Sequence, residues 1–206
     1  MSFTILDWGR RDYVTAWDDQ RAVVDEVLAG GPDTLIFVEH PPVLTLGASF
    51  HEENLLLPLA EYEAQGIEVV RTDRGGDVTY HGPGQLVIYP IFNLEGQGKD
   101  LHKWIRSLEG KILSVCSALG LEGRRFPLHT GVWLGDLKVA AIGIKVRRWV
   151  SMHGVALNCD LDMEVFEQIV PCGIQGYGVT SLSAALGRRV SVAEAKELVI
   201  SAFAGV

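Results

Sequence analysis

A lysine and a cysteine within one stretch, from Lys138 to Gly173, have the side chains needed for nucleophilic chemistry. The stretch contains two strand-like runs and a short helical run, and it ends with Cys172 between Pro171 and Gly173. Because proline fixes one backbone torsion and glycine leaves room beside the sulfur, Cys172 is expected on a turn. A partly buried ammonium next to a thiol favours the thiolate, which is the nucleophilic form. Cys172 is therefore a candidate nucleophile, and Lys138 is the candidate for stabilising its thiolate.

Both residues also have a structural interpretation. Strand alternation places Lys138 on the apolar face of its strand, together with Ile142, Ile144 and Val146. Such a lysine needs a partner or a use for its charge, or it extends its ammonium to water from the strand end. A lone free cysteine such as Cys172 is more often a small buried hydrophobic residue than a nucleophile, and its setting on a turn does not reverse this. The spacing alone does not show that the two side chains meet.

A glycine-rich segment, RGGDVTYHGPGQLVIYPIF at residues 74–92, is the second candidate for chemistry. Its four glycines permit positive φ and let a ligand approach the backbone closely. It lacks the Gly-Lys-Ser/Thr of a phosphate loop, and Val87 stands where a dinucleotide fingerprint needs its third glycine. The sequence leaves two alternatives open, a ligand-binding loop and a glycine-rich hairpin with bulges. His81 lies within the segment, where an imidazole could donate to a ligand or orient a base.

The other histidines give no metal-binding pattern. The six histidines are scattered, with no His-Glu-x-x-His and no paired Cys/His spacing, so no metal site is expected. His153 precedes Gly154 on a strand face that it shares with Val155 and Leu157, and it is expected to be a half-buried structural histidine.

Composition limits the class of protein. The chain has 206 residues, 48% hydrophobic and 21% charged, which is enough for one domain with a substantial core. A net charge of -8 argues against nucleic-acid binding. Three cysteines without a Cys-x-x-Cys, and no signal-like N-terminus, indicate free thiols in a reducing cytoplasm. No apolar run approaches membrane-spanning length, so a soluble protein that does not enter a membrane is expected.

The chain as a whole predicts one domain of mixed helices and strands. Helices are expected at 12–29, at about 53–66, at 100–119 and from Ser191, where Ser191 and Glu194 form a capping box. Strands are expected on both sides of Pro41-Pro42, at 67–72 and within the glycine-rich segment. A hairpin that turns at Gly135-Asp136 and a strand at 152–158 follow. The other two cysteines, Cys116 and Cys159, are expected to be structural.

Four motifs in this order resemble the lipoate-protein ligase B family, the octanoyl-carrier-protein:protein N-octanoyltransferases. The motifs are RGGDVTYHGPGQLVIYP, KVAAIGIKV, MHGVALNCDLD and IVPCGI, and the match runs from about Thr45 to Ser181. The ordered set is specific, whereas each motif alone is weak. The resemblance implies a single α+β domain over residues 1–206, with a mixed sheet flanked by helices, as in biotin and lipoate protein ligases. It also implies an acyl pocket beside the glycine-rich loop.

The resemblance assigns roles to particular residues. It makes Cys172 the nucleophile that accepts the acyl group, and Lys138 the residue that lowers the pKa of this thiol and takes part in proton transfer. Asp77 stands where relatives often have glutamine, a departure expected to leave the backbone contacts intact. The segments implied to bind substrate are Arg74, Gly75, Gly76, Asp77, Val78, Thr79, Tyr80 and His81, then Ala141, Ile142 and Gly143, then Gly154, Val155 and Ala156.

The implied reaction moves an octanoyl or lipoyl group from an acyl carrier protein thioester to a lysine of an apo lipoyl domain. Implied acceptors are the lipoyl domains of 2-oxoacid dehydrogenase complexes and the glycine cleavage H protein. Converting a thioester into an amide is downhill, so neither ATP nor another cofactor is implied. Three alternatives remain: an ATP-dependent lipoate or biotin ligase, a cysteine thioesterase or amidase, and a non-enzymatic domain that binds acylated carriers.

A basic cluster of Lys145, Arg147 and Arg148 stands out in this acidic chain. A solvated strand edge is the simpler interpretation. The alternative is a docking patch for acidic carrier or lipoyl domains, which would act mainly on the rate of encounter.

Overall fold

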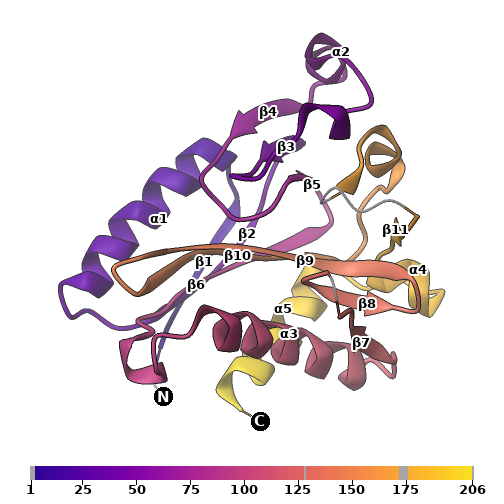
Figure 1. The fold of residues 1–206 in the computed structure, drawn as a ribbon. Helices are drawn as coiled ribbons and strands as arrows, with labels where there is room; N and C mark the ends of the chain where they lie inside the picture. The colour runs from indigo at the N-terminus through magenta and orange to yellow at the C-terminus, as the bar shows by residue number, and fades with distance from the viewer. Residues whose placement is uncertain (1–2, 128, 172–175, 206) are drawn as a thin grey trace.

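The computed structural model describes residues 3–127, 129–171 and 176–205, and its main element is a mixed eight-stranded sheet (Figure 1). The sheet order is β1 (Thr4–Arg10), β2 (Thr34–Glu39), β6 (Gln85–Ile91), β10 (Val150–Asn158), β9 (Leu137–Arg147), β8 (Val132–Leu134) and β7 (Gly123–Arg125), and β11 (Gly178–Val179) also pairs with β9. The β1–β2 and β9–β11 pairs are parallel, and the other pairs are antiparallel.

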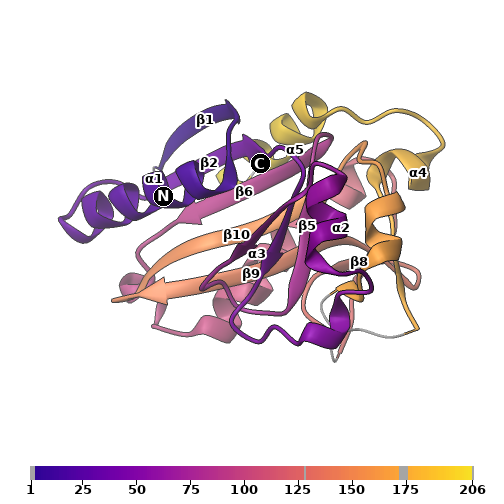
Figure 2. The same ribbon diagram turned by 90° about the horizontal axis from the view of Figure 1, so that it is seen from above.

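A second, three-stranded sheet lies above one face of the main sheet, as seen from the front and from above (Figures 1 and 2). Its order is β4 (Glu68–Arg71), β3 (Val43–Leu46) and β5 (Val78–His81), and the short helix α2 (Leu59–Ala64) connects β3 to β4. Two short 3-10 helices, η1 (Glu52–Asn54) and η3 (Glu164–Gln168), accompany it. Its core includes Leu44, Val78, Tyr80 and Phe166.

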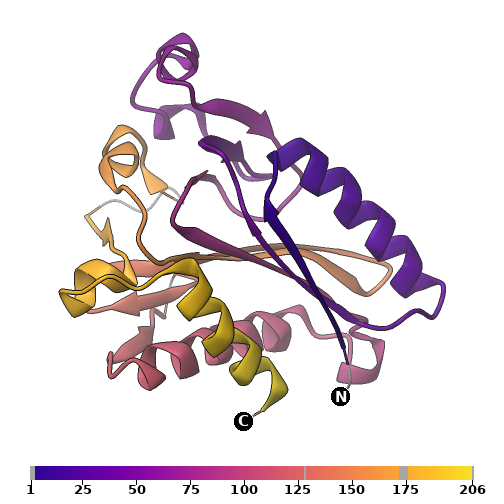
Figure 3. The ribbon, with the colours of Figure 1, turned by 180° about the vertical axis from the view of Figure 1, so that it is seen from behind.

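Helices cover both faces of the main sheet. The long helix α3 (Leu101–Ala118) and the C-terminal α5 (Val192–Ala204) pack below it, as the rear view in Figure 3 shows, and α1 (Tyr13–Leu28) packs above it. The central strand β6 is buried on both faces: Leu86 and Ile88 face α3 and α5, whereas Val87, Tyr89 and Ile91 face α1. Two further short elements, η2 (Glu95–Gln97) and α4 (Leu182–Leu186), connect these layers.

The helix boundaries follow from local chemistry. Asp100 caps α3, since its carboxylate accepts a hydrogen bond from Lys103 N at 3.0 Å, and Gly120 follows the helix with a φ of +75°. Ser191 caps α5 in the same way by accepting from Glu194 N at 3.1 Å. The Glu194 carboxylate pairs with Arg188 at 2.8 Å.

The expected α+β fold is confirmed, and so are most of its elements. The strands and helices predicted from apolar periodicity and from capping residues are present, including the hairpin at Gly135-Asp136. The apolar pattern of the sequence does not predict β1, β7, the two-residue β11 or α4. The β1 strand is mostly exposed at the edge of the sheet, and β7 and α4 are only three and five residues long, so none has a strong apolar pattern. No helix in the described part of the chain is long and apolar enough to cross a bilayer.

Candidate active site

A pocket lies between the main sheet and the small sheet, beside the glycine-rich loop. It has about 460 Å³ of space unfilled by protein atoms, including its open mouth. The walls are mostly apolar where β6, β9 and β10 form them and more polar near α1. The lining residues are Tyr13, Arg74, Gly75, Gly76, Thr79, His81, Val87, Tyr89, Ala141, Ile142, Gly143, His153, Gly154, Val155 and Ala156.

All the predicted substrate-binding segments reach this pocket, but not every residue in them does. Along β5 the side chains alternate, so Thr79 and His81 line the pocket while Val78 and Tyr80 are buried in the core of the small sheet. The Asp77 side chain also points elsewhere, because it accepts hydrogen bonds from Asn54 Nδ2 at 2.8 Å and from His51 Nδ1 at 2.9 Å. Asp77, Val78 and Tyr80 therefore support the loop without lining the pocket.

Arg74 fixes the shape of the glycine-rich loop. Its buried guanidinium donates to Thr45 Oγ1 at 3.0 Å, to Asp77 O at 2.7 Å and to Gly75 O at 3.1 Å. The Gly75 N–H then donates to Ile144 O of β9 at 3.0 Å. A Cβ added to Gly143 would lie 2.7 Å from Gly75 O, so the loop can approach β9 this closely only because residue 143 is a glycine; a Cβ on Gly75 would be tight as well, 3.1 Å from Ile144 O.

The expected position of Lys138 is wrong, and a β-bulge is the reason. The pairing between β8 and β9 shifts register, from Val132 opposite Ala140 to Trp133 opposite Lys138, which leaves Val139 as an extra residue. Val139 and Ala140 both pack in the core beneath the sheet. Lys138 is thereby turned to the opposite face from Ala140, where it lines a small hollow together with Ala141. Only 4% of its surface is exposed.

This hollow adjoins the pocket. Ala141 and Thr79 line both cavities. Cys172 lies outside the described residues, but Pro171, immediately before it, lines the hollow that contains Lys138. On the other side of Cys172, β11 pairs with β9 so that Val179 is opposite Lys138. The chain therefore passes Lys138 both just before and shortly after the candidate nucleophile.

A buried row of hydrogen-bonded side chains connects the pocket to this hollow. Thr45 Oγ1 accepts from Arg74, so its hydroxyl proton is available for His81 Nε2, 3.3 Å away. His81 then has its proton on Nδ1 and donates it to Gln85 Oε1 at 2.7 Å. Burial lowers the pKa of His81 well below 6.5, which agrees with a neutral ring.

The row continues past Gln85 to the chain beside Lys138. Gln85 Nε2 donates to Asn158 Oδ1 at 2.9 Å, and Asn158 Nδ2 donates to Thr180 O at 3.0 Å. The Thr180 N–H donates to Lys138 O at 2.9 Å. Gln85 and Asn158 line the hollow, so these amides fix its polar wall.

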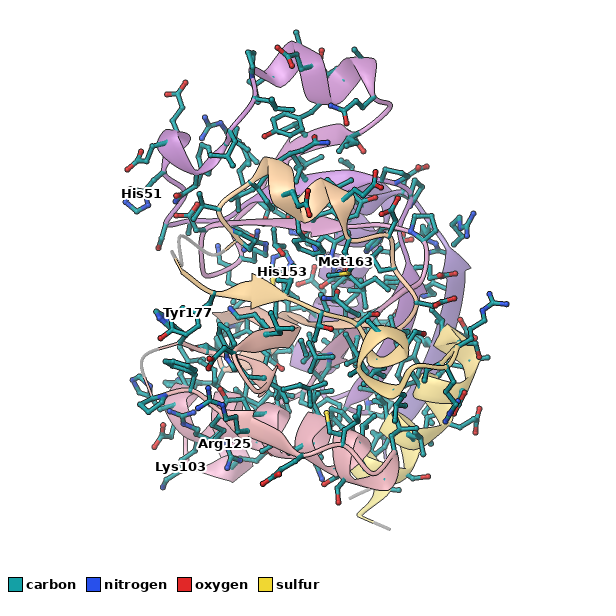
Figure 4. All side chains as sticks on the ribbon, turned by 90° about the vertical axis from the view of Figure 1, so that its right-hand side faces the viewer. His51, Lys103, Arg125, His153, Met163 and Tyr177 are labelled. Atoms are coloured by element: carbon teal, nitrogen blue, oxygen red, sulfur yellow. The ribbon has the colours of Figure 1, made fainter. Side chains whose placement is uncertain are left out.

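His153 also departs from its predicted place. Alternation puts it on the face of Val155 and Leu157, which pack beneath the sheet, but its φ of +56° turns it toward α1. Its N–H donates to Gln20 Oε1 at 2.9 Å, and its ring lies 5.9 Å from the Trp17 ring. The side chain is 2% exposed, lies in the interior (Figure 4) and lines the pocket. It is more than a half-buried structural histidine.

Several residues that form these cavities were not predicted from the sequence. Tyr13 was assigned only to the apolar stripe of a helix, yet it lines the pocket and stacks on His81, with ring centroids 5.7 Å apart. Gln85 and Asn158 were treated only as parts of strands. A polar residue at the end of a run of buried strand residues, as in QLVI of β6 and VALN of β10, is the signal that could have identified both, because such an amide is buried and needs partners.

The two remaining cysteines are structural, as predicted. Cys116 and Cys159 are fully buried free thiols, and burial raises the pKa of Cys116 to about 11 and that of Cys159 to about 12. Among the described residues, no group of three or more His, Cys, Asp or Glu side chains could hold a metal ion.

Two members of the basic cluster form ion pairs with acidic residues. Lys145 Nζ lies 2.8 Å from Asp73, and Arg147 lies 2.9 Å from Asp25. Arg148 is at the β9–β10 turn with a φ of +50°. These pairs agree with the simpler interpretation, a solvated strand edge.

The fold and the cavities define a class of α+β proteins in which a glycine-rich loop covers an apolar pocket on a mixed sheet. Solved structures share this fold. The chain is similar to a putative lipoate protein ligase from T. acidophilum with bound lipoic acid (TM-score 0.75, 17% identity, covering 100% of this chain and 86% of that one). It is also similar to a lipoate-protein ligase A bound with ATP (TM-score 0.76, 18% identity, covering 100% of this chain and 85% of that one). A biotin protein ligase from Aquifex aeolicus is a more distant match (TM-score 0.56, 12% identity, covering 99% of this chain and 69% of that one).

Sequence comparison gives the family. A family model described as the lipoyl protein ligase A/B catalytic domain matches residues 12–204. A curated octanoyltransferase from Roseiflexus sp. (strain RS-1) is 47% identical over 203 residues, covering 97% of this chain and 85% of the relative. One from Mycobacterium marinum is 48% identical over 202 residues, covering 94% of this chain and 83% of the relative. The chain belongs to the lipoyl protein ligase A/B catalytic domain family, as its motifs predicted.

Proposed function

We propose that this chain transfers an octanoyl group from a carrier-protein thioester to a lysine of an apo lipoyl domain, through an acyl-enzyme on Cys172. Membership of the family, and relatives named octanoyltransferase at 47–48% identity, support octanoyl transfer as the activity of an acyltransferase. The cysteine mechanism rests on one observation: Lys138 is buried in a hollow that is also lined by Pro171, the residue before Cys172.

In the first half-reaction, the Cys172 thiolate attacks the carbonyl carbon of the donor thioester. The bond between that carbon and the donor sulfur breaks, and the carrier leaves as a thiol after taking up one proton. A Lys138 ammonium beside the sulfur favours the attacking thiolate and can supply this proton. The product is an octanoyl thioester on Cys172.

In the second half-reaction, the ε-amine of the acceptor lysine attacks the acyl-enzyme. An amide bond forms, the bond to Cys172 Sγ breaks, and the amine loses one proton. Lys138, neutral after the first half-reaction, would accept that proton, which restores the starting pair of ammonium and thiolate. A thioester replaces a thioester in the first step and an amide replaces a thioester in the second, so the transfer needs no separate activation of the acyl group.

The acyl chain would extend from the hollow into the pocket, past Ala141, which lines both. In this arrangement the substrate-binding residues are Gly75 and Gly76 of the loop, Thr79 and His81 of β5, and the segments 141–143 and 154–156. The donor would be octanoyl-acyl carrier protein, and the acceptors would be the lipoyl domains of 2-oxoacid dehydrogenase complexes and the glycine cleavage H protein. Buried free thiols at Cys116 and Cys159 fit a cytoplasmic location.

The proposal is tested by mixing the protein with octanoyl-acyl carrier protein and an apo lipoyl domain, without ATP. Mass spectrometry should show octanoylation of the lipoyl-domain lysine with the wild type, and at least a hundredfold less with Cys172→Ala. Modification that requires ATP and free octanoate, and that survives Cys172→Ala, would identify a ligase instead. Steady release of octanoate without an acceptor would identify a thioesterase.

The role of Lys138 has its own test. Lys138→Met removes the ammonium and keeps a side chain of similar length, so the Cys172 thiol should lose its thiolate at neutral pH. The pH profile of Cys172 alkylation should therefore shift upward by about 1 unit or more. An alkylation profile identical to that of the wild type would remove Lys138 from this role.

A further inference from the structure

One end of the pocket presents a buried hydrogen-bond acceptor. His153 is 2% exposed and lines the pocket, and its Nδ1 has no hydrogen-bond partner among the described residues. Its other ring nitrogen, Nε2, lies 2.8 Å from Asp73 Oδ1. The carboxylate accepts from Nε2–H, so in the neutral ring Nδ1 carries a lone pair and acts as an acceptor.

The orientation and protonation state of this ring are fixed. The main-chain N–H of His153 donates to Gln20 Oε1. Lys145 Nζ donates to Asp73 Oδ2 at 2.8 Å, so the carboxylate that accepts from the ring is itself fixed in position. Burial lowers the pKa of His153 to about 4 although Asp73 favours the charged ring, and Arg74 and the Lys145 ammonium add to the lowering. The backbone of His153 is left-handed, with a φ of +56°, a strained conformation for a non-glycine strand residue, and it directs the ring to the pocket.

His153 lies about one octanoyl chain away from the hollow that contains Lys138. Ala141 lines both cavities, and Ile144, the strand partner of His153, is three residues further along β9. Three strand residues span about 10 Å. The seven carbon–carbon bonds of an extended octanoyl chain, each about 1.5 Å long and set at tetrahedral angles, span about 9 Å. A thioester carbonyl beside Ala141 would therefore bring carbon 8 to the level of His153 along the sheet.

We propose that His153 is a specificity-determining residue whose Nδ1 accepts a hydrogen bond from a substituent on carbon 8 of the acyl chain. It enables the pocket to take eight-carbon acyl groups whose last carbon carries a hydrogen-bond donor, a hydroxyl or a thiol, as well as octanoyl itself. A terminal hydroxyl would donate to Nδ1 and recover its lost hydration, whereas in a wholly apolar pocket the same hydroxyl would be buried without a partner. This inference rests on the proposed acyl transfer and adds to it a class of substrate.

The test compares octanoyl, 8-hydroxyoctanoyl and 8-mercaptooctanoyl thioesters of the same acyl carrier protein, with an apo lipoyl domain as acceptor. For the wild type, the kcat/KM of each substituted donor should be within about threefold of that of octanoyl, or above it. His153→Leu should lower the ratio of 8-hydroxyoctanoyl to octanoyl about 10- to 100-fold, because the hydroxyl loses its acceptor. His153→Asn should restore part of the ratio, since asparagine tolerates the left-handed backbone and carries an acceptor oxygen.

Met152→Leu is the matched control, because Met152 is the adjacent buried residue of β10, packs against α1 and does not line the pocket. It should leave the ratio unchanged. A wild type that prefers octanoyl over 8-hydroxyoctanoyl by a hundredfold would overturn the inference without any variant, and so would an unchanged ratio in His153→Leu. Failure of octanoyl transfer itself would count against the proposed function, so the two failures are distinguishable.

Discussion

The close approach of the glycine-rich loop to β9 makes Gly143→Ala a sensitive probe of the pocket. The new Cβ would lie 2.7 Å from Gly75 O, whereas ordinary contacts begin at 3.4 Å, so the loop must move by about 0.7 Å. The loop resists this movement because Gly75 N is bonded to Ile144 O and because Arg74 is tied to Thr45 and to Asp77 O.

Overpacking of this kind costs about 1–3 kcal/mol, which for a chain of this size corresponds to a fall in Tm of about 2–12 °C. The displaced loop also forms a wall of the pocket, so kcat/KM for octanoyl transfer should fall about tenfold or more. Scanning calorimetry and initial rates measure both quantities. Gly96→Ala is the control, because nothing lies within 4 Å of a Cβ at that position. If Gly143→Ala matched Gly96→Ala in Tm and in kcat/KM, the reasoning about the loop would be refuted.

Buried titratable groups give two further predictions. Burial lowers the pKa of His40 and of His153 from 6.5 to about 4, so as pH falls below 6.5 the unfolded chain binds protons first. The free energy of unfolding should therefore be unaffected by each of these histidines above pH 6.5. It should fall by up to about 3 kcal/mol for each of them as the pH decreases toward 4. Equal denaturation midpoints at neutral pH and at about pH 4 would contradict this. Because the pKa of Cys116 and that of Cys159 are raised, iodoacetamide near pH 7.5 should label Cys172 alone in the folded protein, and a label on Cys159 under these conditions would be inconsistent with its burial.

The sequence predicted the parts of the fold that depend on local chemistry. The Asp100 and Ser191 caps, the stop at Gly120 and the turn at Gly135-Asp136 all follow from single residues whose preferences are strong. The β1 strand was missed because exposed edge residues carry no apolar pattern.

The candidate site was harder to predict, because two of its residues break strand alternation. Lys138 reaches the pocket face only through the bulge at Val139, which the pairing with β8 determines. His153 reaches it through a left-handed backbone torsion. Both depend on tertiary pairing and not on the local pattern of apolar residues, so a period-2 pattern assigned each side chain to the wrong face. The motifs identified the lysine as a candidate, and its role stays a prediction; they did not predict the bulge that positions it.

The central claim, an acyl-enzyme on Cys172, is tested most directly by intact-mass spectrometry. The protein would be mixed with octanoyl-acyl carrier protein, beside Cys172→Ser as the control. The wild type should gain the mass of one octanoyl group, the adduct should map to Cys172 and be released by hydroxylamine, and an apo lipoyl domain should discharge it. An adduct on another residue, or transfer to the lipoyl domain at the wild-type rate by Cys172→Ser, would contradict the mechanism.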